Sequence, residues 1–284
     1  RLPVMIVTGN VPFLEETNNR DDQITVNIDY FNFQDPSRSF RMVNAAMRPQ
    51  GTSSMGYPKK NFRIYTEKLE NTILYDANNR VVENKLYSFK KKAQPVNCWC
   101  LKADYAESSG THNTGIARLW NEVLVNTKID DGYPLRTKAQ RCALENDYPC
   151  DVRTTIDGFP ILMFYRLEED SPLVFIGKYN FNNDKSTESV FGFRDIPGFE
   201  NDNMQCWEIL NNGNSISLFT DISKFYELIT VEGKTQEGWK FAFESRYPDT
   251  KTPDTVVCLY DFCRWMTNVS EELFSDQKWD HLDV

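Results

Sequence analysis

The chain has 284 residues, of which 40% are hydrophobic and 26% are charged, and its formal net charge at pH 7 is −9. This length and composition are those of a globular protein that can bury a full core, in one large domain or two lobes. The negative charge argues against a general nucleic-acid-binding protein, which would need a basic face. No apolar run approaches the ~20 residues that a membrane-spanning helix needs.

Hydrophobic alternation predicts a sheet in the N-terminal part of the chain. The clearest segment is 23–33, where Ile24, Val26 and Ile28 share one face. We expect a mixed, mainly antiparallel sheet from four segments: residues 1–8, 23–33, 60–65 and 97–102.

A helical pattern follows the last of these strands. Five apolar residues recur at three- and four-residue spacing and predict a helix over 113–126 that packs on the sheet: Ile116, Leu119, Trp120, Val123 and Leu124. Periodicity alone does not say whether this helix has a role beyond the core.

Turn signals organise the second half of the chain. Two Asp-Gly or Asn-Gly turns predict hairpins: residues 152–165 around Asp157-Gly158, and residues 206–210 with 215–220 around Asn211–Gly213. A helical pattern returns over 255–269.

Seven cysteines and two histidines limit the metal and disulfide chemistry. Seven is an odd number, so at least one thiol is unpaired. Because there is no Cys-x-x-Cys pair, a zinc site is not expected. The pattern favours a reducing compartment with most thiols free, and disulfides remain the alternative.

Several charged groups have simple structural interpretations. Lys90–Lys92 predict an exposed loop. Asp104 and Glu107 precede the expected helix, whose dipole favours acids at that end in any case. Glu168 follows a strand, where it could lie near the ribose or adenine of a nucleotide or at a solvated strand end.

The stretch 47–65 carries the most specific chemistry. A Gly- and Ser-rich loop over 51–56 precedes an alternating run in which Lys60 lies in phase with Phe62 and Ile64. A lysine beside free backbone N–H groups could clamp a phosphate. An ordinary hairpin whose lysine extends its ammonium to the sheet edge explains the same pattern. The residues alone leave both interpretations open.

This stretch also resembles a family signature, Gly-Ser-Ser … Pro-Lys-Lys … Arg-Ile. Four further stretches match in the expected order: Leu101–Ser109, Ile156–Glu168, Gly177–Lys185 and Cys206–Asn212. Together they resemble the CotH kinase-like family, atypical kinases known from bacterial spore coats and also found in large phage and surface proteins. The last two stretches resemble its phage-type variants. The resemblance covers most of residues 1–250, although Gln50-Gly51 stands where the family has Arg-Gly.

The resemblance implies an α+β fold. We expect a kinase-like small lobe with a mixed, mainly antiparallel sheet and a packing helix, an inserted β-rich subdomain, and the start of a helical lobe. The expected boundaries are 1–150, 151–250 and 251–284. The family's metal-binding and catalytic acids follow a long helical region, so we expect them beyond residue 284. The chain, which begins with Arg1, is then the N-terminal part of a longer protein and alone inactive in phosphoryl transfer.

The resemblance also implies a ligand and its site. ATP and Mg²⁺ are the implied ligands, with no catalytic residue assigned within the chain. Lys60 and Arg48 are expected to face the β- and γ-phosphates. The nucleotide-binding candidates are loop residues, basic residues and one acid: Arg48, Gly51, Ser53, Ser54, Lys59, Lys60 and Glu168.

Two functions of different classes follow from the resemblance. The first is a structural or adhesion component of a phage virion or tail, assembled in the host cytoplasm, with other protein chains as partners. The alternative is an ATP-dependent atypical protein kinase that phosphorylates Ser or Thr. A cell surface or spore coat is the alternative location.

Overall fold

The computed structural model describes residues 1–106, 108–110, 112–127, 137–184, 188–194, 196–199, 205–210, 218, 220–248 and 252–281. The chain divides into two compact units, residues 1–199 and 200–284. We call them the barrel unit and the C-terminal unit. No helix among the described residues is long and apolar enough to cross a membrane.

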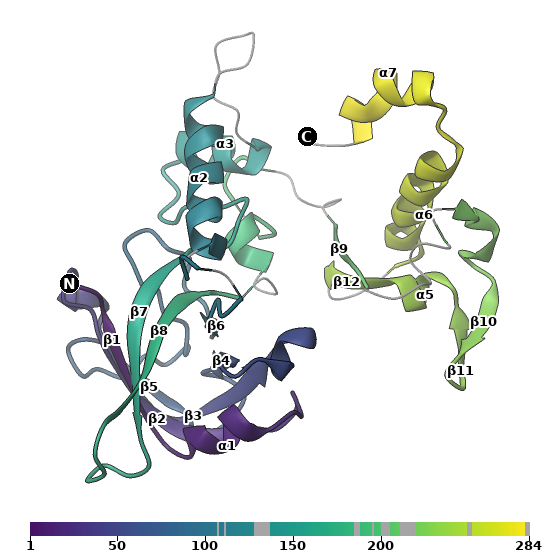
Figure 1. Ribbon diagram of the computed structural model, residues 1–284. Helices are drawn as coiled ribbons and strands as arrows, with labels where there is room; N and C mark the ends of the chain where they lie inside the picture. Colours follow the sequence, from purple (N-terminus) through teal and green to yellow (C-terminus); the bar gives the residue numbers. More distant parts are fainter. Residues whose placement is uncertain are drawn as a thin grey trace. The chain divides into compact units, whose positions relative to one another are not determined.

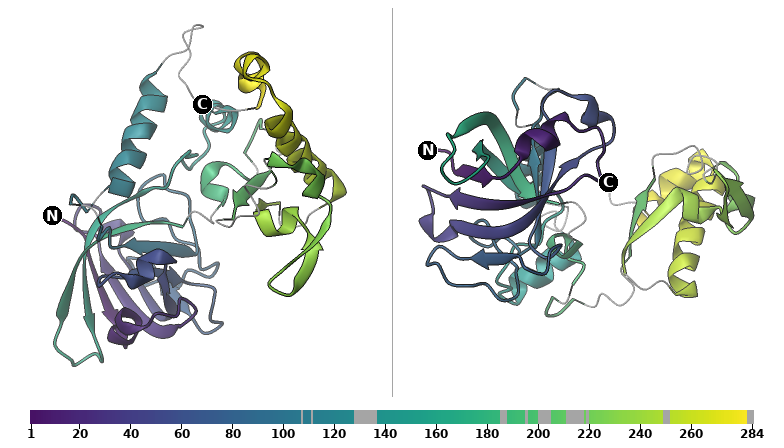
Figure 2. Two further views of the ribbon diagram at one scale, coloured as in Figure 1. Left: turned by 45° about the vertical axis from the view of Figure 1, so that its right-hand side comes forward. Right: turned by 90° about the horizontal axis from the view of Figure 1, so that it is seen from below.

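A closed barrel of seven strands forms the first unit (Figures 1 and 2). Around the barrel the strands follow the order β2 (Ile24–Phe31), β1 (Val4–Thr8), β7 (Gly158–Arg166), β8 (Val174–Asn183), β6 (Cys98–Lys102), β4 (Asn61–Tyr65) and β3 (Phe40–Gln50). β3 then pairs back with β2, and the short β5 (Ile73–Tyr75) pairs with the start of β3. Only the β1–β7 pair in the ring is parallel. The α+β class and the mixed, mainly antiparallel sheet are thus confirmed, with all four expected segments in it.

The barrel interior is the main hydrophobic core. Phe181 lies at its centre, with ring contacts to Tyr30, Phe89 and Trp99 at centroid distances of 5.4, 5.6 and 6.2 Å. Lys60 lies on the inward side with Phe62, and the two side chains are 4% and 0% exposed. The expected phase of Lys60 with its apolar neighbours is therefore confirmed.

The α-helices in the described residues of the barrel unit are α1 (Val11–Glu16), α2 (His112–Asn126) and α3 (Lys138–Glu145). α3 begins with a capping box in which Thr137 and Gln140 satisfy each other's backbone N–H groups. α3 packs through Ala139 and Cys142 on a small separate cluster with Val152.

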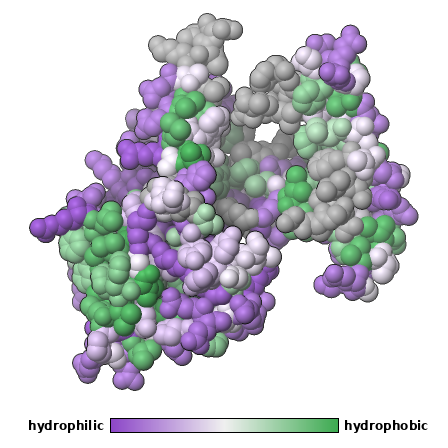
Figure 3. All heavy atoms as spheres, viewed as in Figure 1, coloured by the Kyte–Doolittle hydropathy of each residue, from purple (hydrophilic) through white to green (hydrophobic). Residues whose placement is uncertain are grey.

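α2 forms where the sequence predicts it but buries a different face. Four residues of the expected apolar stripe are between 39% and 59% exposed: Ile116, Leu119, Trp120 and Val123. Figure 3 shows hydrophobic residues at the surface along this helix. The helix instead meets polar side chains on the outside of the barrel, because Thr114 Oγ1 donates to Asn180 Oδ1 at 3.2 Å and Asn121 Nδ2 donates to Thr155 Oγ1 at 2.6 Å.

The hairpin predicted around Asp157-Gly158 is wrong. Gly158 is the first residue of the continuous strand β7, which turns into β8 only after Arg166. Asp157 does not make a turn there, because its backbone lies along the end of β8: its carbonyl accepts from the Asn183 N–H at 3.1 Å and its N–H donates to Asn183 Oδ1 at 2.6 Å. β9 (Cys206–Ile209) pairs with β12 (Phe243–Tyr247), and most of the segment 215–220 that was predicted to pair with 206–210 lies outside the described residues.

The C-terminal unit has its own core. Its elements are β9, β10 (Leu228–Val231), β11 (Lys234–Glu237), α5 (Trp239–Ala242), β12, α6 (Pro253–Asn268) and α7 (Glu271–His281). β10 and β11 form an antiparallel hairpin. α6 starts at a Thr252–Thr255 capping box and buries Leu259 and Cys263 against Phe225 and Trp239. The helical pattern expected over 255–269 is confirmed.

The two units differ from the three expected segments. The boundary at 150 is not seen, because β7 and β8 close the barrel between β1 and β6. The boundary at 250 is not seen either, because α6 shares one core with Phe225 and Trp239. None of the seven cysteines, all of which the structure describes, forms a disulfide.

Candidate functional site

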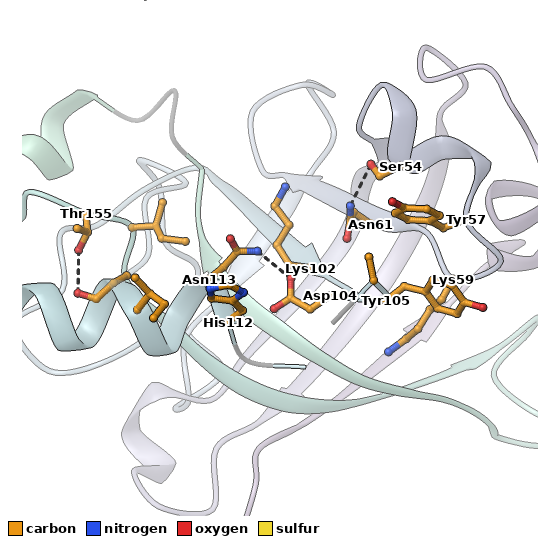
Figure 4. A pocket seen from close by; sticks show the side chains of 14 residues that line it. Ser54, Tyr57, Lys59, Asn61, Lys102, Asp104, Tyr105, His112, Asn113 and Thr155 are labelled. Atoms are coloured by element: carbon orange, nitrogen blue, oxygen red, sulfur yellow. Dashed lines mark hydrogen bonds between the residues drawn. The ribbon is translucent and has the colours of Figure 1, made fainter. Parts of the chain in front are cut away.

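A cavity of about 550 Å³ lies on the barrel unit between three segments: the loop before β4, the end of β6 and the first turns of α2. The residues that line it with polar or aromatic groups are Ser54, Tyr57, Lys59, Asn61, Lys102, Asp104, Tyr105, His112, Asn113 and Thr155. In Figure 4, Asp104 lies beside His112 and Asn113, while Ser54 and Asn61 lie across the cavity. We call it the Lys59 cavity.

The loop over residues 51–58 is held in one conformation by Gly51 and by hydrogen bonds from the side chains of Lys60 and Asn61. Gly51 has φ +132°, and a Cβ at this position would collide with the Ser54 hydroxyl, so only glycine fits. The buried Lys60 ammonium donates to the Met55 carbonyl, and Asn61 Nδ2 donates to Ser54 Oγ at 3.4 Å. These two hydrogen bonds hold the short 3₁₀ turn Ser53–Gly56 in place.

Lys59 is the half-buried cation of this cavity. Its Nζ lies 4.3 Å from the centre of the Tyr179 ring and donates to the Lys178 carbonyl. Desolvation, and then the Lys178 ammonium, lower the pKa of Lys59, while Asp104 acts in the opposite direction. An anion in the cavity would offset this desolvation.

Asp104 is the only carboxylate among the described lining residues. It has a left-handed backbone (φ +44°) and accepts hydrogen bonds from two neutral amides, Asn113 Nδ2 at 2.8 Å and Asn180 Nδ2 at 2.5 Å. Within the described part of the chain Lys102 has no carboxylate partner. Two lysines therefore face one acid, and the cavity has excess positive charge in an acidic protein.

Two tyrosines border the cavity. The rings of Tyr57 and Tyr105 have their centroids 5.6 Å apart, and the residues are 40% and 52% exposed. Exposed aromatic faces of this kind can stack on a planar ligand group.

The predicted site residues do not all meet. Ser54 and Lys59 line the cavity. Gly51 and Lys60 shape the loop instead, and Ser53 belongs to the same turn without lining the cavity. Lys60 points at the Met55 carbonyl, with Asn18 Oδ1 at 3.4 Å, so the structure does not place its ammonium where a phosphate in this cavity would lie.

Two further candidates lie elsewhere on the barrel. The Arg48 guanidinium is 5.2 Å from the centre of the Tyr65 ring, and Arg48 faces Arg63 across the β3–β4 pair. Glu168 is exposed in the turn between β7 and β8, beyond the strand end opposite to the one that reaches the cavity. Neither residue lines the cavity.

Sequence reasoning missed the amides and Asp104 as members of this site. The available signal was Lys102-Ala-Asp104 between a strand and a helix, with an Asn-rich strand later in the chain. Asn61 also belongs here, because its Oδ1 accepts from the Ala103 N–H at 2.8 Å and fixes the chain leading to Asp104.

A polar cluster on the barrel wall, made of Asp184, Arg63 and Cys100, has a structural role. Asp184 forms an ion pair with Arg63 and accepts a hydrogen bond from Cys100 Sγ at 3.0 Å. Burial, and then the Asp184 charge, raise the pKa of Cys98 to about 12 and move the pKa of Cys100 in the same direction. Both thiols therefore stay protonated at neutral pH, which is typical of structural rather than reactive cysteines.

Metal ligands are few in the described residues. No group of three or more His, Cys, Asp or Glu side chains in this part of the chain lies close enough to hold a metal ion. Asp104 is the carboxylate that the cavity offers. Mg²⁺ commonly binds through one or two carboxylates together with substrate phosphates, so one aspartate fits a nucleotide-bound ion better than a free one.

Comparisons with known proteins add no name to this site. The chain matches no family model, and a search of curated proteins finds no match to it either.

Proposed function

We propose that the chain is a CotH-kinase-like module whose barrel unit binds a nucleotide, with ATP as the expected ligand. One observation supports this most: a Gly- and Ser-rich loop and two lysines meet at one cavity, where Lys59 is half-buried. The cavity volume of about 550 Å³ lies within the roughly 300–1,000 Å³ of small-molecule sites.

Each part of a nucleotide has a matching group in the Lys59 cavity. Phosphates would take Lys59 and Lys102 as cations and the Ser54 hydroxyl as a donor. A purine would lie against Tyr57 or Tyr105, because an aromatic ring and a base can stack. When bound, Mg²⁺ would neutralise phosphate charge, and Asp104 is the residue that would hold it.

The role we propose for this module is structural or adhesive, in a phage virion or tail assembled in the host cytoplasm. The family resemblance supports it, and so does the exposed apolar face of α2, a surface of the kind that contacts other protein chains. A cell surface or a spore coat is the alternative location. Nucleic acid is not an expected partner of a chain with net charge −9.

An atypical protein kinase is the second candidate, and Asp104 favours it. An aspartate next to two cations, held by neutral amides, is suited to bind a metal or to orient an acceptor hydroxyl. Phosphoryl transfer would also need the further acids that the resemblance implies beyond residue 284.

Calorimetric titration with ATP, with and without Mg²⁺, tests the proposal. Lys59→Met and Lys102→Met should each weaken binding roughly tenfold, because each removes a charge-assisted contact. Lys138→Met is the matched control, because Lys138 is exposed on α3. No ATP binding by the wild type, or equal affinity in Lys59→Met, would contradict the nucleotide site. Robust Mg²⁺-dependent autophosphorylation would favour the kinase.

A further inference from the structure

A second cavity, of about 780 Å³, lies beside α2 and takes no part in the proposed nucleotide site. α2 lines it with Thr114, Arg118, Asn121 and Glu122, whereas His112, Asn113 and Ile116 line the first cavity. The remaining wall comes from the start of β7, the loop after β2 and the Lys90–Lys91 turn. We call it the Arg118 cavity.

One buried carboxylate at this cavity is shared by two cations. Asp157 is 6% exposed, and its Oδ1 lies 2.5 Å from Lys90 Nζ and 3.3 Å from an Arg153 guanidinium nitrogen. Its backbone N–H donates to Asn183 Oδ1 at 2.6 Å, so the aspartate is held in place. One negative charge against two positive charges leaves an excess of one.

The guanidinium of Arg153 is not fully satisfied. Its Nε is buried and has no hydrogen-bond partner. A buried donor of this kind is costly unless a bound group approaches it. Lys90 was expected in an exposed loop, and the structure instead turns its ammonium toward Asp157.

Two more cations line the cavity without an acid. Arg118 and Lys91 are exposed, and neither has a carboxylate partner in the described part of the chain. The other acids at the cavity are Asp35, whose carboxylate lies 3.8 Å from Arg38, and Glu122, which lies 3.5 Å from the Asn126 amide. The amide leaves the charge of Glu122 in place, so four cations and three acids line the cavity, and an excess of one positive charge remains.

The rest of the lining is partly apolar. Phe159 and Pro160 at the start of β7, together with Leu2 and Pro3, form this part of the wall. We propose that the Arg118 cavity binds a small organic carboxylate, whose acid group lies among Arg118, Lys91 and Arg153 and whose apolar body contacts Phe159 and Pro160. A monoanion matches the single uncompensated charge of the Asp157 cluster, and the guanidinium fork matches a carboxylate.

Benzoate and benzamide are suitable probes, because they share size and ring and differ in charge. In ¹H–¹⁵N spectra of the whole chain, benzoate should shift amide signals at Lys91, Arg118 and Gly158, and benzamide should not. A third arm with inorganic phosphate separates carboxylate recognition from general anion binding. Equal shifts with benzamide, or stronger saturable binding of phosphate, would overturn the proposal.

Variants at the exposed cations localise the effect. Arg118→Gln and Lys91→Gln should each raise the benzoate Kd roughly tenfold, and Arg118→Lys should restore part of the affinity. Lys92→Gln is the matched control, because Lys92 neighbours Lys91 but does not line this cavity. Unchanged benzoate affinity in Arg118→Gln would overturn the proposal.

The two sites can fail separately. Lys59→Met should leave the benzoate Kd unchanged, and Arg118→Gln should leave ATP affinity unchanged, because their side chains line different cavities. A benzoate Kd that changes in Lys59→Met but not in Arg118→Gln would place the carboxylate in the nucleotide cavity and overturn the second site.

Discussion

The Lys59 and Arg118 cavities lie beside the same helix, and Asp104 in the first is held in a different way from Asp157 in the second. Asp104 accepts hydrogen bonds from two neutral amides, so the nearby lysines keep their charge for a ligand. Asp157 binds Lys90 and Arg153 directly, so these two cations are first of all structural. The comparison teaches that the partners of an acid decide whether neighbouring cations stabilise the fold or remain available for binding.

Replacing the two aspartates should give the largest difference. Asp157→Asn leaves two cations without their buried carboxylate and should lower the free energy of unfolding by about 3–5 kcal/mol. Asp104→Asn loses only hydrogen bonds to amides and should cost about 1.5 kcal/mol. Urea denaturation of both variants measures this, with Asp35→Asn as a control in an exposed turn. Equal costs for Asp104 and Asp157 would remove the distinction.

Lys59 and Lys60 sharpen the comparison within one loop. Lys60→Met removes the donor to the buried Met55 carbonyl and should lower the free energy of unfolding by about 1–3 kcal/mol. Its ATP affinity should change less than that of Lys59→Met, for which we expect a roughly tenfold loss. Denaturation and ATP titration of both variants give the two numbers. A larger ATP effect at Lys60 would return that residue to the phosphate site.

The smallest expected effect is the pH dependence that Lys59 gives first to stability and then to ATP binding. Because desolvation and Lys178 lower the pKa of Lys59 in the folded protein, the unfolded chain holds this proton more tightly. The residue therefore costs stability when it is protonated in both states, and this cost fades as pH rises from the lowered pKa toward the ordinary value of 10.5.

ATP affinity should fall over the same pH window, because an uncharged amine does not neutralise phosphate. Lys59→Met should not show this fall. Benzoate affinity at the Arg118 cavity should change less over the same window, since two of the three cations placed around the carboxylate, Arg118 and Arg153, are guanidinium groups that stay protonated. Titrations at several pH values compare the two, and parallel profiles would contradict the assignment of Lys59.

Hydrophobic patterns within short segments correctly predicted those strands in which the apolar face of the pattern is the buried face. The alternation of Ile24, Val26 and Ile28 predicted β2. Lys60, just before β4, and Phe62 within it are both buried, as their shared phase in the sequence predicted. Barrel closure was not predictable in this way, because the parallel β1–β7 pair joins segments far apart in the chain.

The site was predicted only in part for a related reason. Ser54 and Lys59 stand in a local motif, so the sequence pointed to them. Asp104, by contrast, depends on Asn180 from β8, and α2 turns its small and polar face to the barrel because the outer wall there is polar. A periodicity argument assumes an apolar partner surface and therefore chose the opposite face.

Amide mapping of ATP on the wild-type chain tests the central claim most directly. In ¹H–¹⁵N spectra recorded during an ATP titration, we expect saturable shifts at Ser54, Tyr57 and Lys102, with the signals of Lys91 and Arg118 unchanged. This pattern would place the nucleotide in the Lys59 cavity. Shifts confined to Lys91 and Arg118, or no saturable shift at millimolar ATP, would contradict it.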